Sequence, residues 1–429
     1  MRNLKRLHLL LVALFMAFAM AFNPFAQAAS QPVTITLWHT LEEMYREDFQ
    51  KLVDSFMEEN PDITVVVEYQ GRVAEILQKV LAANVAGSDV LPAVFPVHSA
   101  EIKNLARDGV VRNLDALIAE NGTDLEKMLM KDAYAYEGSQ YGLTWTLTGI
   151  SYFINQTILA EEGLTFPATW DEMDGFLRKA TIKNDDGTTK RYGIWLPGWD
   201  SYYFTWMFWN QGIVTINEEG ETQINSEKAA QVVNQLKTWV DDGLIMWGYG
   251  SNGSSNMRSA FWDGAAVAIV HTSSQYQNHL DNMAQKGYEL GVSMPPSGDV
   301  LATTEVFGMS LNIPSKIDDS LVPAAYKLLA YLTSRDVNRD MASFTGFLAN
   351  HSDAMATPEG QEWLKANPAM TGLYDSIENM TTAVQITAYN AITDVMEDGL
   401  ALILLEGEDV QTGLDNMAEQ IITLFEDQD

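Results

Sequence analysis

The stretch "PVTITLWHTLEEMYREDFQKLVDSFMEENPDITVVVEY", from Pro32 to Tyr69, decides the class of fold. Both of its ends are apolar and rich in β-branched residues, which is typical of strands. Between them, Thr40 and Glu43 have the spacing of a helix capping box, and Asn60-Pro61 would stop a helix near Glu59. The stretch therefore predicts a strand, a helix and a second strand.

The same rhythm continues downstream. A helix is expected over 73–87, a buried strand over 92–97 and a helix near 100–107. Strands that alternate with helices form parallel sheets covered on both faces, so the fold class is α/β. Further strands are predicted at 150–155, 264–274 and 307–313, and further helices at 169–179, opened by a Thr169/Glu172 capping box, and at 226–241, 323–333, 337–343, from Thr357-Pro358 onward, and over much of 391–425.

The first 28 residues read as a secretory signal peptide. Arg2, Lys5 and Arg6 precede the apolar run 9–22, which is too short for a membrane span, and Ala26-Gln27-Ala28 forms a cleavage signal. The sequence contains no cysteine, which excludes disulfides, zinc-thiolate sites and a lipid-modified cysteine anchor. We expect a soluble protein that begins near Ala29 and is periplasmic, with full secretion as the second choice.

The chain is strongly acidic, with a formal net charge of −32. A polyanion is repelled by nucleic acid and by anionic membranes, so neither is an expected partner. No run of the D-x-D-x-D-G type indicates a calcium loop. We expect no cofactor and no metal, and the acidity is interpreted as a solubility feature.

Several segments in collinear order carry a family resemblance. They are "ITLWHT", "FMEENPDITVVVEYQG", "GISYFINQTILAEEGLTFPATWDEM", "AFWDGAAVAIVHTSS", "FGMSLNIP" and "FTGFLAN". Together they resemble the extracytoplasmic solute-binding proteins of ABC sugar importers, and within them the glycerol-3-phosphate and oligosaccharide binders. The resemblance covers essentially the whole chain after the signal peptide.

The resemblance implies a type II periplasmic-binding-protein fold, in which two α/β lobes enclose a ligand cleft. It places the first lobe at 29–144 plus 301–345, and the second at 145–300 plus 346–429. It also implies a monomeric, non-catalytic receptor that hands its ligand to the transmembrane subunits of an ABC permease. In open α/β sheets, ligands do bind where loops converge beyond the carboxyl ends of strands.

The stretch "GWDSYYFTWMFWNQG", from Gly198 to Gly212, is unusually aromatic. Trp199, Tyr202, Trp206 and Trp209 share one face if the stretch is a single helix. We expect that face to be core, with Trp209 inside it. The end at Trp199, Asp200 and Tyr202 is expected in the cleft, because aromatic rings stack on the apolar faces of sugars.

Other candidate ligand residues lie where predicted strands end or the chain crosses between lobes. Polar side chains there can serve sugar hydroxyls, and a glycine lets backbone approach the ligand. Some of these residues have competing structural explanations. Glu43 can cap a helix, His39 can be a hydrogen-bonded structural histidine, and 144–149 can be an ordinary connection between lobes. The candidates are Trp38, His39, Glu43, Ser99, Trp145, Thr146, Thr148, Trp199, Asp200, Tyr202, His271, Thr272, Ser273, Phe307, Gly308 and Phe347.

The sequence departs from the glycerol-3-phosphate binders in two places. Where those proteins have an acid after the third strand, this chain has His98-Ser99, and 388–398 contains no arginine or lysine. A phosphate dianion needs a charge-assisted donor, so a neutral sugar or oligosaccharide is the expected ligand. The alternative ligands for the same fold are glycerol 3-phosphate, a glycerophosphodiester and a polyamine.

A secreted glycoside hydrolase is the alternative from another class. It would need paired carboxyl groups across the substrate, and no such motif is apparent. His271 and Ser273 do not make a hydrolase pair, because no nucleophile-elbow motif or orienting acid accompanies them.

Overall fold

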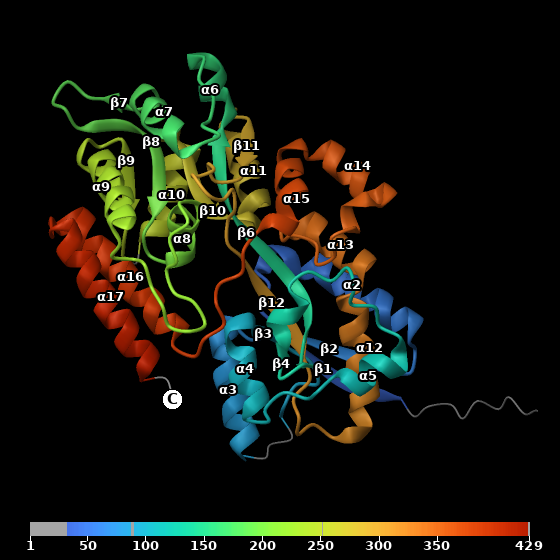
Figure 1. The fold of residues 1–429 in the computed structure, drawn as a ribbon. Helices are drawn as coiled ribbons and strands as arrows, with labels where there is room; N and C mark the ends of the chain where they lie inside the picture. Colours follow the sequence, from blue (N-terminus) through green and yellow to red (C-terminus); the bar gives the residue numbers. More distant parts are fainter. Residues whose placement is uncertain (1–31, 87–89, 251, 428–429) are drawn as a thin grey trace, which may run out of the picture.

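The computed structural model describes residues 32–86, 90–250 and 252–427, so the predicted signal peptide lies outside the described residues. The chain forms two α/β lobes (Figure 1), each with its own hydrophobic core. The elements around the first core are β1 (Val33–His39), η1 (Glu43–Tyr45), α2 (Arg46–Glu59), β2 (Ile63–Tyr69), α3 (Val73–Ala86), β3 (Phe95–His98), η2 (Ser99–Glu101), α4 (Ile102–Arg107), α5 (Asp115–Asn121), β12 (Val306–Asn312), α12 (Val322–Leu332) and α13 (Arg335–Thr345).

The second lobe contains the remaining large elements. They are α6 (Gln156–Glu162), α7 (Met173–Ala180), β7 (Ile182–Lys183), β8 (Thr189–Pro197), η5 (Ser201–Tyr203), α8 (Thr205–Asn210), α9 (Glu227–Asp241), β9 (Ile245–Gly248), α10 (Gly253–Trp262), β10 (Ala266–Thr272), η6 (Ser273–Gln275), α11 (Tyr276–Gln285), β11 (Leu290–Ser293), α14 (Pro358–Ala366), α15 (Thr371–Ser376), α16 (Tyr389–Ala401), the π-helical turn η11 (Leu402–Glu406) and α17 (Val410–Glu426).

One strand, β6 (Leu143–Asn155), belongs to both lobes, and all thirteen of its residues are buried. Its first half pairs antiparallel with β12, and its second half pairs antiparallel with β10 and β11. Figure 1 shows it running from one lobe into the other. Sequence reasoning expected a strand only over 150–155 and a connection before it; the connection is in fact strand.

The sheets are mixed rather than parallel throughout. β1 and β2 are parallel, as predicted, and a bridge between Leu37 and Val94 places the segment before β3 beside β1. β12, however, runs antiparallel to both of its neighbours, β3 and β6. The reason is that β12 returns to the first lobe from the second, a long-range connection that local periodicity does not reveal.

Helix boundaries agree well with the predicted caps, with one exception. The Thr169–Glu172 capping box is present, and the Thr357 hydroxyl accepts a hydrogen bond from the Gly360 N–H. The Thr40–Glu43 box is wrong, because no side chain caps η1 and the Thr40 hydroxyl instead contacts the Met309 sulfur at 3.8 Å. The elements β8, β9, α10 and α11 were not predicted.

The aromatic stretch is not one helix. Phe204, with φ of −131°, separates η5 from α8. The expected division into a core face and another face therefore fails: Phe204, Trp206 and Phe208 are all essentially buried. Trp209 is only partly buried, and its indole nitrogen donates to the Thr215 hydroxyl at 3.1 Å. The prediction that Trp209 lies in the core is therefore wrong.

Two buried asparagines hold the chain where α13 leads back to the second lobe. The Asn350 amide donates to the carbonyls of Thr144 and Thr333 at 2.6 and 2.8 Å, and the Asn338 amide donates to the carbonyl of Trp145 at 2.6 Å. Asn338 also accepts from the Asn350 N–H at 2.8 Å. Two of these bonds give partners to buried backbone carbonyls of β6, at Thr144 and Trp145.

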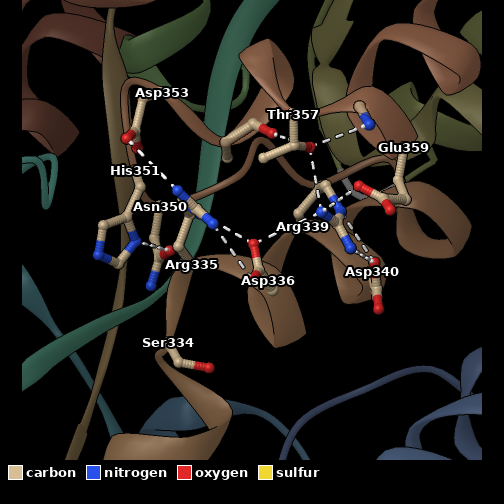
Figure 2. A network of polar contacts seen from close by, with 12 residues as sticks. Ser334, Arg335, Asp336, Arg339, Asp340, Asn350, His351, Asp353, Thr357 and Glu359 are labelled. Carbon is tan, nitrogen blue, oxygen red and sulfur yellow. Dashed lines mark hydrogen bonds and ion pairs between the residues drawn. The ribbon is translucent and has the colours of Figure 1, made fainter.

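Figure 2 shows the polar network beside this pair. Arg339, on α13, is 8% exposed and lies 2.6 Å from an Asp340 oxygen and 3.3 Å from a Glu359 oxygen. It also donates to the Thr357 hydroxyl at 3.0 Å. Through these contacts, α13 is fixed to the start of α14.

Replacing Trp206 by alanine should strongly destabilise the protein. Its ring is fully buried and packs edge-on against Tyr152 at 5.8 Å. Truncation of a buried tryptophan costs about 3 to 5 kcal/mol of unfolding free energy. Urea unfolding of Trp206→Ala and Trp209→Ala tests this; equal losses for the two variants would contradict the revised core.

Candidate ligand-binding cleft

A cavity of about 340 Å³ lies between the two lobes. The first lobe contributes α3, β3 and η2, and the second contributes η5 and α16, while residues before and within β12 form its inner wall. Its lining consists of Val73, Ala74, Leu77, Pro96, Val97, His98, Ser99, Ala100, Glu101, Tyr202, Glu305, Phe307, Ala383, Gln385, Tyr389 and Asn390.

Aromatic rings form one wall of the cavity. The rings of Tyr202 and Phe307 lie 4.8 Å apart between centroids, and Tyr202 also packs on Tyr203 at 4.4 Å. The Tyr202 hydroxyl donates to Asp200 at 2.8 Å, which fixes the orientation of its ring. This wall offers the flat, apolar surface that the C–H face of a sugar ring needs.

The polar groups of the lining are uncharged or acidic. His98 Nδ1 lies 3.2 Å from the Gly308 carbonyl oxygen, to which it donates, and burial lowers the pKa of His98, so its ring is neutral at pH 7. Among the described residues, no lysine or arginine lines this cavity. The arrangement can exchange hydrogen bonds with neutral groups but lacks a charged donor for an anion.

A pair of carboxyl groups lies beside the aromatic wall. Glu397, on α16, accepts from the Ser201 N–H at 2.8 Å. Burial, together with the charge of Asp200, raises the pKa of Glu397 to about 8, and burial also raises the pKa of Asp200. These acids hold protons at neutral pH more readily than exposed carboxyl groups do.

Contacts cross between the lobes at both ends of the cleft. At one end, Asn390 on α16 donates to Glu101 on η2 at 3.5 Å, and Lys103 donates to the Gln385 carbonyl at 3.0 Å. At the other, the Tyr45 hydroxyl reaches the Ser274 carbonyl at 3.5 Å. The lobes therefore touch on both sides of the cavity.

Of the candidate ligand residues, the structure brings Ser99, Tyr202 and Phe307 together in the cavity lining. Asp200 adjoins them through its bond to Tyr202. These residues come from η2, from the loop and turn after β8, and from β12, so segments about 100 residues apart in the sequence meet here.

A second group lies where β6 passes between the lobes. The hydroxyls of Thr148 and Ser273 are 3.1 Å apart, and those of Thr272 and Ser274 are also 3.1 Å apart. Thr146 accepts from the Met309 N–H at 3.3 Å. Gly308 belongs to the same region, where a Cβ on it would lie 1.9 Å from the Thr146 carbonyl oxygen.

Other candidates have partners within one lobe. Trp38 donates to Glu68 at 2.9 Å, and the His39 ring accepts from the Leu41 N–H at 3.1 Å. Trp145 is fully buried against Phe49 in the first core. The remaining candidates outside the cavity lining are Glu43, which is exposed, Trp199, which packs on Tyr203, and Phe347, which packs on the first core.

His271 lies on a buried chain of rings. Its Nδ1 is 3.0 Å from His279 Nε2, and His279 Nδ1 accepts from the Trp262 indole nitrogen at 3.0 Å. Burial lowers the pKa of His271 to about 3. His271 is therefore bonded inside the second lobe and does not line the cavity.

Sequence reasoning missed Glu305, Tyr389, Asn390 and Glu101 as lining residues. Glu305 could have been selected from the sequence, because it is an acid at the end of a polar segment that directly precedes an apolar strand. Tyr389 begins a helix in a region where only the missing arginine was noticed. Among the described residues, no cluster of three or more metal-ligating side chains is found, and none of the described helices is long and apolar enough to span a membrane.

A family model described as bacterial extracellular solute-binding protein matches residues 51–372, which is most of the chain. The chain belongs to this family. A binding protein of Brucella abortus (strain 2308) is 23% identical over 368 residues, covering 83% of this chain and 84% of the relative. Members of an extracellular family are exported, in agreement with the expected localisation.

Solved structures share the fold. The GacH receptor of Streptomyces glaucescens, solved unliganded and in complex with acarbose, matches with a TM-score of 0.76 at 21% identity, covering 92% of this chain and 99% of that one. UgpB of Mycobacterium tuberculosis, in complex with glycerophosphocholine, matches with a TM-score of 0.78 at 19% identity and the same coverage. This solute-binding protein therefore has the two-lobe architecture that the resemblance implied.

The contribution of Glu397 to the stability of the protein should fall as pH rises toward about 8. When folding raises the pKa of a carboxyl group, the group stabilises the fold fully at pH values below its pKa in the unfolded chain. This contribution is lost as pH rises toward its pKa in the folded protein, which is about 8 for Glu397. Glu397→Gln keeps an acceptor for Ser201 and should flatten this decline. Urea unfolding between pH 5 and 9 measures it, with Glu161→Gln, an exposed acid on α6, as the control; an unchanged slope in Glu397→Gln would contradict the assignment.

Proposed function

We propose that this protein is the substrate-binding component of an ABC transporter and that it binds a neutral sugar or oligosaccharide in the interlobe cavity. The observation that carries the proposal is the cavity itself, which combines the ring wall of Tyr202 and Phe307 with hydrogen-bonding groups and no lining cation. Sugar rings need both kinds of surface. The complex of the similar GacH receptor with acarbose agrees with this ligand class.

In the proposed cycle, ligand binding favours closure of the lobes, and the closed form is presented to the transmembrane subunits of a permease. The protein would act as a monomer in the periplasm after removal of residues 1–28. We retain the proposed lobe segments 301–345 and 346–429. We propose that the chain first passes from the first lobe to the second near Gly149 rather than at Thr144, because Leu143 and Trp145 pack in the first core.

A phosphorylated ligand is disfavoured by the lining. The complex of the similar UgpB with glycerophosphocholine makes this the natural competitor. A phosphate in a closed cavity needs arginine, lysine or several backbone donors, and no described lining residue supplies the charge.

A polyamine is the second candidate, and one observation favours it. Glu101 and Glu305 line the cavity with aromatic rings, and Asp200 is bonded to Tyr202 of the ring wall, which suits a cation. The protein is proposed to be non-catalytic in either case. Incubation with the bound glycan, followed by chromatography, should return the glycan uncleaved.

A ligand panel separates these alternatives. We would measure binding of four compounds by calorimetry: maltotriose, N,N′-diacetylchitobiose, glycerophosphocholine and spermidine. At least one of the two sugars should bind, and glycerophosphocholine and spermidine should give no heat. Binding of glycerophosphocholine or spermidine alone would refute the proposed ligand class.

Removal of a ring from the wall should weaken sugar binding. Phe307→Ala and Tyr202→Ala each remove a stacking partner, worth about 0.5 to 1.5 kcal/mol beyond burial, so affinity should fall at least two- to tenfold. Tyr331→Ala, which removes a ring packed on Phe56 outside the cleft, should leave affinity unchanged. Equal effects at the two places would show that the wall is not the binding surface.

A further inference from the structure

Glu305 is the most buried ionisable group of the interlobe cavity that sequence reasoning did not select. Its side chain lines the cavity and the residue is only 3% exposed. The carboxyl group accepts a hydrogen bond from the Thr205 hydroxyl at 3.0 Å and is also hydrogen-bonded to the Tyr389 side chain. Its partners therefore come from α8 and α16 of the second lobe.

The backbone of Glu305 lies beside two of the crossings between the lobes and beside the segment that leads to α16. Its carbonyl accepts from the Ile150 N–H at 3.0 Å, at the point where β6 changes partners. A parallel bridge joins Glu305 to Thr381, and the Val306 N–H donates to the Thr381 carbonyl at 2.9 Å. The carboxyl group is thus held in place by the hinge region and by the second lobe together.

Among the described residues, no lysine or arginine lines the cavity beside this carboxyl group. Tyr389 is the titratable group bonded to it, and the other ionisable residues of the lining are His98, Glu101 and Tyr202. Burial raises the pKa of Glu305 to about 7, while burial lowers that of His98. An ionised carboxylate in a largely apolar enclosure without a cation is costly, and closure around a ligand removes more water from it.

We propose that Glu305 selects the ligand as a neutral acid, which accepts a hydrogen bond from one ligand hydroxyl and donates its own proton to a ligand oxygen. After Thr205 and Tyr389 are bonded, a neutral carboxyl group still has one donor and one acceptor position. Neighbouring hydroxyls of an uncharged polyol match this pair. The inference rests on the proposed function, since it takes the ligand to be a saccharide.

The direction in which ligand affinity changes with pH follows from the proposal that Glu305 binds the ligand in its neutral form. If only protonated Glu305 binds, affinity is full well below pH 7 and falls as pH rises above it. Between pH 5.5 and 8.5, the dissociation constant should rise about thirtyfold for a group that titrates near pH 7. A ligand amine would instead be favoured by the ionised form, and its affinity would rise with pH.

Calorimetry with maltotriose and N,N′-diacetylchitobiose at pH 5.5, 7 and 8.5 tests the inference on the wild-type protein and three variants. In Glu305→Gln the Thr205 hydroxyl can rotate to accept from the amide, which leaves one donor and one acceptor for the ligand, so this variant should bind at every pH and lose the pH dependence. Glu305→Ala should bind about tenfold or more weakly at pH 5.5, the loss expected for one buried hydrogen bond. Glu161→Gln, an exposed acid on α6 away from the cavity, should keep the wild-type pH dependence.

The outcomes separate the two proposals. If a sugar binds and Glu305→Gln shows the same pH dependence as the wild type, or the wild type binds more tightly at pH 8.5, the role of Glu305 is refuted while the proposed function stands. If neither sugar binds the wild type and spermidine does, the proposed function is refuted, and the selection of a polyol by Glu305 falls with it.

Discussion

The structure depends on one buried strand. All thirteen residues of β6 are buried, and its backbone groups must find partners inside the protein. The first half finds them in β12 and the second half in β10 and β11. The two asparagines, Asn338 and Asn350, complete this pairing at carbonyls near its start. Because this strand is central to one eight-stranded sheet that takes strands from both lobes, the lobes cannot separate without breaking these bonds.

The cavity lies beside the point where β6 changes partners, and this explains why it can sense a ligand. Backbone contacts join Glu305 to Ile150 on β6 and to Thr381 in the segment before α16. Glu305 and Phe307 form the inner wall, while η2 and α16 close the cavity from the two lobes. A ligand that touches all of these surfaces gains most of its contacts only when the lobes are together, which is the differential affinity that closure requires.

Acidity acts differently at the surface and in the cleft. Exposed carboxylates keep the chain soluble and are well hydrated, so the net charge of −32 says little about the ligand. Inside the cleft, the same residue type loses its water. Burial raises the pKa of Glu305 to about 7, and burial together with the charge of Asp200 raises the pKa of Glu397 to about 8. Buried acids of this kind become neutral hydrogen-bonding groups, which are suited to neutral ligands rather than to phosphates.

The sequence by itself determined the local elements and the family resemblance. β-branched runs, helix caps such as Thr169 and Thr357, and the collinear segments were enough for the α/β class and most boundaries, because these signals act over a few residues. Tertiary structure decided the rest. It made 143–149 part of a strand shared by the lobes, broke the aromatic stretch at Phe204, and buried Trp145 and His271. Only folding brings Ser99, Tyr202, Glu305 and Tyr389 into one cavity, since no local pattern encodes contacts between residues about 100 positions apart, and burial, rather than residue type, sets the protonation of Glu305.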